Sequence, residues 1–252
     1  MRVEIWSDVV CPWCYIGKRR LEAALGRFDH AEEVEVAWRS FELDPAARRV
    51  REGDPTRSLA TKYGITLEEA AAFQARMTEA AAGEGLAFDF SALRPGNSFD
   101  AHRLLHLATD EGLGDALQER LFAAYLCEGQ AIAEPEVLAG LAVGAGLASE
   151  RVRAVLDSGA YADQVRAEEA EAAALGINGV PYFVVDHTYG VSGAQRPGLL
   201  LAVLQRAWAA GRTTLVRVAA EGGRGEDGAC RDGTCIVASG EEGLAASGGA
   251  QP

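Results

Sequence analysis

Basic residues are scarce in this sequence: 24 lysines and arginines stand against 37 aspartates and glutamates, a formal net charge of −13 at pH 7. The field of such a chain repels phosphate groups, so we expect no nucleic acid and no anionic membrane surface as main partner. Long apolar runs are also missing, because the longest stretch of apolar residues and glycine, 137–148, is too short to span a bilayer. The first residues contain no apolar segment of the secretory type. We therefore expect a cytoplasmic protein that acts on small molecules or on proteins.

Cysteines are equally few, and their placement is informative. The chain has five: the close pairs Cys11/Cys14 and Cys230/Cys235, and the single Cys127. This is too sparse for a disulfide scaffold, and in a reducing compartment such close pairs are more often catalytic or metal-binding than structural. The helical pattern around Cys127 predicts a buried small hydrophobic residue.

Apolar periodicity predicts the order of the elements. Residues 3–7 alternate as in a strand, helical spacing follows from Cys14 onward, and residues 34–38 alternate again, so the chain opens with a βαβ unit. Short strands at 182–185 and 189–192, followed by an amphipathic helix, form a β-β-α unit that completes it.

The residues between these units are alanine-rich with helical spacing. The capping box from Thr66 to Glu69 and Pro135 at a first helical position mark helix starts, which predicts a helical insertion. Beyond residue 211 the composition becomes glycine-rich and predicts a flexible tail. In that tail, a tight-turn signal between Cys230 and Cys235 would bring the two thiols together.

The tetrapeptide of residues 11–14 carries the chemistry. Pro12 is favoured as the first helical residue, which makes Cys11 the N-cap, where the N–H groups of the next turn and the helix dipole favour a thiolate. Cys11 is then the nucleophile of disulfide exchange, and Cys14, one turn inside the helix, is the resolving thiol. Trp13 is expected to be partly exposed and to shape the substrate surface. Because no histidine separates the cysteines, we expect a less extreme oxidant than an enzyme that has one there.

A zinc site is the main alternative for a C-x-x-C motif. Its position between a strand and a helix start favours redox chemistry, although a four-cysteine zinc site built from both pairs stays open. His102 and His106 have a spacing that can hold a metal, but no cysteine or carboxylate motif accompanies them. We predict no metal and no cofactor.

Three blocks of this sequence, in order, match a known family: residues 7–15 (SDVVCPWCY), 97–104 (NSFDAHRL) and 179–183 (GVPYF), the last followed by VSGAQ at 191–195. From residue 2 to about 210 the chain resembles the DsbA-like thioredoxin-fold oxidoreductases, most closely the FrnE-like branch. The resemblance implies that Pro181 is a cis proline facing the cysteines. The backbone of Val180 would then be free to pair with an extended substrate strand.

The resemblance also implies an α/β architecture: a thioredoxin fold interrupted by a helical insertion. We assign 1–50 and 176–211 to the thioredoxin-like domain, 51–175 to the insertion and 212–252 to the tail. The tail looks like that of extended FrnE-like members, in which a C-x4-C pair, here Cys230 and Cys235, forms a second redox pair.

The implied function is that of a thiol-disulfide oxidoreductase or isomerase acting on protein disulfides. Its partners would be protein thiols and disulfides and a cellular thiol reductant or oxidant; the direction of electron flow and the oligomeric state stay open. One alternative is a glutathione-dependent isomerase or transferase with a small organic, polyketide-like substrate. Enzymes of that kind have serine at the position of Cys11, so the cysteine argues against it. The other alternative is a thiol-based metal-binding or redox-sensing protein.

Overall fold

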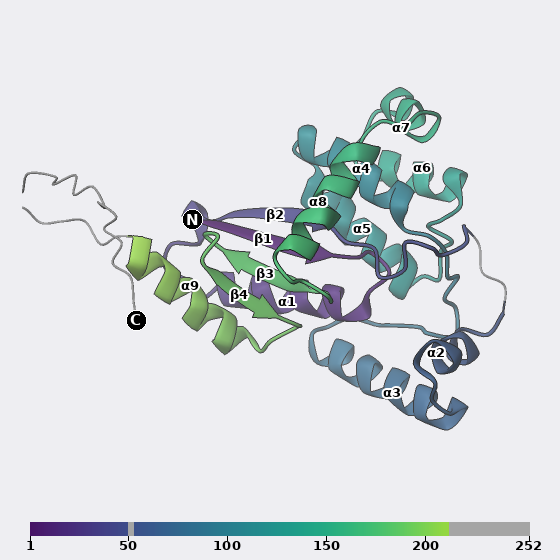
Figure 1. The fold of residues 1–252 in the computed structure, drawn as a ribbon, viewed down its shortest axis with the longest axis horizontal. Helices are drawn as coiled ribbons and strands as arrows, with labels where there is room; N and C mark the ends of the chain where they lie inside the picture. Colours follow the sequence, from purple (N-terminus) through teal and green to yellow (C-terminus); the bar gives the residue numbers. More distant parts are fainter. Residues whose placement is uncertain (50–52, 212–252) are drawn as a thin grey trace, which may run out of the picture. The chain divides into compact units, whose positions relative to one another are not determined.

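The structure, a computed structural model, describes residues 1–49 and 53–211 (Figure 1). Residues Met1–Arg212 form one compact unit. The elements in chain order are β1 (Arg2–Ser7), α1 (Pro12–Leu25), the 3₁₀ helix η1 (Ala31–Glu33), β2 (Glu35–Ser40), α2 (Pro55–Tyr63), α3 (Leu67–Gly83), α4 (Phe99–Asp110), α5 (Gly114–Leu126), α6 (Pro135–Gly144), α7 (Ser149–Leu156), α8 (Ala162–Ala174), β3 (Tyr182–Val185), β4 (Tyr189–Ser192) and α9 (Pro197–Gly211).

The four strands form one sheet in the order β2-β1-β3-β4. The first strand, β1, pairs in parallel with β2 and antiparallel with β3, while β3 and β4 form an antiparallel hairpin. Asp186 and His187 turn this hairpin with φ angles of 46° and 50°, which suit the central positions of a type I′ turn. The predicted βαβ and β-β-α units are both present and share the sheet.

Different helices pack on the two faces of the sheet, and the side chains of β1 point alternately to one face and the other. Val3 and Ile5 pack with Leu204 in a core formed with α1 and α9. Trp6 points to the opposite face, where its indole Nε1 donates to the carbonyl of Glu168 in α8 at 3.1 Å. The sheet is therefore a layer between α1 and α9 on one side and α8 on the other (Figure 1).

Helix α1 also belongs to a second core. Tyr15 and Ile16 pack with Leu104, Leu121 and residues of the other helices that follow β2. Helices α2–α7 gather at the end of the sheet where β1 ends and α1 begins (Figure 1). This arrangement fixes the first turn of α1 between the sheet and the helical part of the chain.

The capping box at Thr66 and Pro135 at the start of α6 are confirmed. Cys127 is an exception: at the C-terminal end of α5 it is only half-buried, because the helix ends there and the chain turns toward the surface. The division into a thioredoxin-like domain and an insertion stays a prediction. The predicted tail with Cys230 and Cys235 lies outside the described residues. Within residues 1–49 and 53–211, no helix is both long and apolar enough to cross a membrane.

Candidate active site

Two cysteines lie where β1 gives way to α1. The chain turns directly after Ser7, the carbonyl of Asp8 accepts the N–H of Cys11 at 3.0 Å, and Pro12 is the first residue of the helix. Cys11 is 4% exposed and Cys14 is fully buried, and neither takes part in a disulfide. The outer cysteine therefore has access to the surface, whereas the inner one is reached only through its partner.

The environment of Cys11 corrects one expectation. Cys11 is the N-cap residue of α1, but its side chain makes no capping hydrogen bond. Its thiol instead donates to the carbonyl of Val180 at 3.6 Å. The physical reason is that the S–H group is a donor and the carbonyl of Val180 lies within its reach, whereas the N–H groups of the helix offer it no acceptor.

The peptide bond between Val180 and Pro181 is cis, as the resemblance implies. Pro181 packs directly against α1 at Gly17, where an added Cβ would lie 3.0 Å from Pro181 Cγ and 3.3 Å from Phe183 Cζ. A glycine one turn after Cys14 thus lets the proline loop approach the cysteines.

We expect Gly17→Ala to lower the free energy of unfolding by about 1–2 kcal/mol, because the new methyl group must displace Pro181 or Phe183. Gly140→Ala in α6 is the matched control. An added Cβ there meets nothing within 4 Å, so helix propensity should raise the stability by up to about 1 kcal/mol. Urea unfolding of both variants measures the effects; equal stabilisation by both would contradict the close packing at Gly17.

Cys14 is held as a thiol. Burial raises its pKa well above the ordinary value, and the neighbouring Cys11 raises it further, while the Ser7 hydroxyl and the Asp8 main chain partly offset this. A protonated sulfur is a poor nucleophile. Cys14 therefore needs to lose its proton at the moment it reacts.

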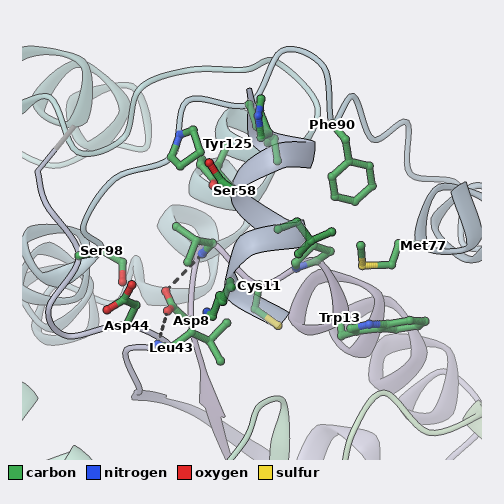
Figure 2. A pocket seen from close by; sticks show the side chains of 18 of the residues that line it. Asp8, Cys11, Trp13, Leu43, Asp44, Ser58, Met77, Phe90, Ser98 and Tyr125 are labelled. Atoms are coloured by element: carbon green, nitrogen blue, oxygen red, sulfur yellow. Dashed lines mark hydrogen bonds between the residues drawn. The ribbon is translucent and has the colours of Figure 1, made fainter. Parts of the chain in front are cut away.

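A cavity of about 280 Å³ opens beside Cys11. Trp13 and Tyr125 contribute to its largely apolar lining together with Met77 of α3 and Phe90 (Figure 2). Trp13 is half-buried, as expected for a residue at a binding surface. The cavity can take an apolar group next to a sulfur that is bonded to Cys11.

Asp8 and His102 also belong to this region, although the sequence assigns no role to Asp8 and the spacing of His102 and His106 suggests only a metal ligand. Both are almost completely buried, with His102 Nε2 3.5 Å from Asp8 Oδ1. Both lie in blocks of the family resemblance, which was the only signal available. Across the part of the chain that the structure describes, no group of three or more His, Cys, Asp or Glu side chains is arranged to hold a metal.

The chain is similar to known proteins over most of its length. The sequence model of the DSBA-like thioredoxin domain matches residues 2–205. A probable DsbA oxidoreductase from Streptomyces coelicolor is 47% identical, with a TM-score of 0.80 over 86% of this chain and 93% of that one. Cytosolic disulfide reductase DsbM from Pseudomonas aeruginosa, solved with glutathione, is 21% identical, with a TM-score of 0.58 over 83% and 100% of the two chains.

A third solved structure, 2-hydroxychromene-2-carboxylate isomerase, is 14% identical, with a TM-score of 0.60 over 84% of this chain and 98% of that one. At such identities, the reductase and the isomerase show the fold alone. Together the matches confirm the predicted thioredoxin fold; the FrnE-like branch stays a prediction.

Proposed function

Because the chain belongs to the DSBA-like thioredoxin family, we propose that it is a thiol-disulfide oxidoreductase that acts on protein disulfides through Cys11 and Cys14. The observation that carries the proposal is the asymmetry of the two sulfurs. Cys11 lines an open cavity, and its thiol contacts the carbonyl of Val180. Cys14 is completely buried behind Cys11, and burial is the main cause of its raised pKa. Such a pair has one attacking thiol and one resolving thiol.

In the reductive direction, Cys11 releases its thiol proton to the solvent, and its sulfur attacks one sulfur of the substrate disulfide. A bond forms between Cys11 and that sulfur, and the other substrate sulfur leaves as a thiolate. Cys14 then attacks Cys11 and forms the Cys11–Cys14 disulfide. The second substrate sulfur is released, and it or the solvent takes up the proton of Cys14. The two electrons that reduce the substrate come from the cysteine pair, and an external thiol restores the dithiol. Disulfide donation is the same sequence in reverse.

The substrate chain is held by the loop before β3. Val180 O accepts the Cys11 thiol in this structure, and it becomes available once that sulfur is bonded to a substrate. An extended substrate segment would use main-chain hydrogen bonds here, so recognition depends little on side chains. The adjoining cavity would receive an apolar group that flanks the reacting cysteine.

The test is reduction of insulin disulfides with reduced glutathione as the electron source. We expect the full-length chain to accelerate it and Cys11→Ser to remove the acceleration. Cys127→Ser is the control, because Cys127 lies outside the cavity lining and should be dispensable. Activity that survives Cys11→Ser would refute the proposal.

We also propose that the pair Cys230 and Cys235 exchanges disulfides with Cys11. Two close thiols in one chain with Cys11 support this, because tethering raises their effective concentration at the site. Removal of residues 222–252 should then change the redox equilibrium between the full-length chain and glutathione. An unchanged equilibrium after the truncation would exclude the exchange.

The cavity favours one second candidate, an enzyme that acts on a small organic substrate with glutathione. Its volume of about 280 Å³ suits a compact organic molecule. In such an enzyme the catalytic thiol belongs to glutathione, so Cys11→Ser would retain activity on the organic substrate. The same variant therefore separates the two candidates. We place either activity in the cytoplasm, as the sparse cysteines suggest.

A further inference from the structure

One exposed leucine lines the cavity beside Cys11. Five large apolar side chains are exposed among the described residues, and only one of them, Leu43, contributes to this cavity. Cys11 and Val180 line the cavity as well. Leu43 lies on one side of Cys11 and Trp13 lies on the other (Figure 2). A solvent-exposed apolar side chain is thus part of the same cavity as the outer cysteine.

The main chain of Leu43 is held by buried polar groups. Its N–H donates to Asp8 Oδ2 at 2.7 Å, and Asp8 is only 1% exposed. The side chain of the preceding residue, Glu42, is completely buried; it accepts a hydrogen bond from Asn97 Nδ2 at 3.0 Å and forms an ion pair with Arg166. Buried carboxylates are costly unless they are paired in this way. Two paired, buried carboxylates therefore fix the position of an exposed leucine.

Asp8 also fixes the turn that leads to Cys11. Its Oδ1 atom accepts the N–H of Val10 at 3.2 Å, and its main-chain carbonyl accepts the N–H of Cys11 at 3.0 Å. Because Oδ2 binds Leu43 while Oδ1 binds Val10, the leucine and the turn before Cys11 keep a fixed relative position. A substrate side chain that enters the cavity therefore meets an apolar surface whose place relative to the sulfur is set before binding.

An apolar side chain on a fixed main chain suits recognition. A flexible segment would lose conformational freedom when a substrate binds, and this loss would weaken the binding. The segment around Leu43 is already ordered by hydrogen bonds to Asp8 and Glu169, which do not involve the substrate. A single exposed leucine is ordinary on a protein surface, so what distinguishes Leu43 is its fixed main chain and its place in one cavity with Cys11.

We propose that Leu43 is a specificity-determining residue, which contacts the side chain next to the reacting cysteine of a substrate. The preferred substrates are then protein segments in which a large apolar residue such as leucine flanks that cysteine. Contact with Leu43 removes apolar surface of both partners from water, and this stabilises the complex in which Cys11 attacks. The inference rests on the proposed function and adds the substrate class to it.

The experiment uses two synthetic peptides, one with leucine and one with serine on both sides of a single cysteine. Each peptide is supplied as its mixed disulfide with thionitrobenzoate. Cys11 releases its proton to the solvent and attacks the peptide sulfur, a bond forms between these two sulfurs, and thionitrobenzoate leaves as a coloured thiolate. Cys14 then displaces the peptide sulfur from Cys11, and that sulfur or the solvent takes up the proton of Cys14. The cysteine pair loses two electrons, and the mixed disulfide gains them.

The parent protein is the full-length chain with every cysteine outside residues 11–14 replaced by serine. Stopped-flow traces give the second-order rate constant of each peptide with the parent, Leu43→Asn, Leu43→Met and the matched control Leu67→Asn. Leu67 of α3 is 49% exposed but does not line the cavity. The readout is the ratio of the two rate constants, because a change in the reactivity of Cys11 itself affects both peptides alike.

We expect the parent to react about tenfold faster with the leucine peptide than with the serine peptide, as partial burial of an apolar side chain implies. Leu43→Asn should lower this ratio to about threefold or less, because a polar amide replaces the apolar contact surface. Leu43→Met keeps an apolar side chain of similar volume and should retain the ratio. Leu67→Asn should have the same ratio as the parent.

The same ratio in Leu43→Asn as in the parent would overturn the inference, and so would equal rates of the two peptides with the parent. If melting curves show that Leu43→Asn is unfolded, Leu43→Ala replaces it under the same criterion. If the parent releases thionitrobenzoate from both peptides no faster than Cys11→Ser does, the proposed function itself is refuted, so the two failures are distinguishable.

Discussion

Cys14→Ser should convert the protein into a trap that keeps glutathione or a substrate protein covalently bound. Cys11 still attacks, because its access to the cavity does not depend on the second sulfur. Resolution requires a sulfur at position 14, directly behind Cys11 in the first turn of α1, and serine cannot form a disulfide. We expect turnover in the insulin assay to fall by at least about 10³-fold, as when a reacting group is removed from an enzyme.

Mass spectrometry of the intact protein after incubation with oxidised glutathione measures the trap. The Cys14→Ser variant should carry one glutathione bound to Cys11, and peptide mapping should locate the glutathione on that residue. The double variant Cys11→Ser/Cys14→Ser is the control and should carry none at this site. Equal labelling of the single and double variants would show that Cys11 is not the attacking sulfur.

The fold and the cysteine pair could be predicted because their signals are local. The alternation in residues 3–7 indicates a strand, and Pro12 indicates the start of a helix, without any information from distant parts of the chain. The cis bond before Pro181 is not a local signal, and only the family resemblance implied it. Local patterns therefore placed the two cysteines at the junction of a strand and a helix, as the structure has them, but described only part of their surroundings.

What the sequence did not show depends on contacts between distant segments. The Cys11 thiol donates to a carbonyl 169 residues away, so a capping rule based on neighbouring residues gave the wrong partner. The cavity is lined by side chains from the first turn of α1, from α2 and α3, and from the segment near Phe90. The Asp8–His102 pair likewise joins the turn after β1 to α4, and no local spacing in the sequence indicates that these two side chains meet.

Glu168→Gln should lower the free energy of unfolding by about 3 kcal/mol at pH 7. Burial alone would raise the pKa of Glu168, but His106, the N–H of Ser40 and Arg39 outweigh it and lower the pKa to about 2. Ser40 N lies 2.7 Å and Arg39 Nη1 2.9 Å from the carboxylate oxygens. A shift from the ordinary 4.5 to about 2 corresponds to about 3 kcal/mol of preference for the charged form.

The sign of this shift fixes the pH dependence. Because the folded-state pKa is depressed, the stabilisation is complete above about pH 5 and is lost as the pH falls through 4.5 toward 2. A protonated glutamate and a glutamine are nearly the same shape, so the unfolding free energies of the wild type and the Glu168→Gln variant should converge as the pH falls to about 2. Urea unfolding at several pH values measures this, with the exposed Glu79→Gln as control. A constant difference between wild type and Glu168→Gln across that range would mean that the charge of Glu168 contributes nothing and that packing alone explains the loss.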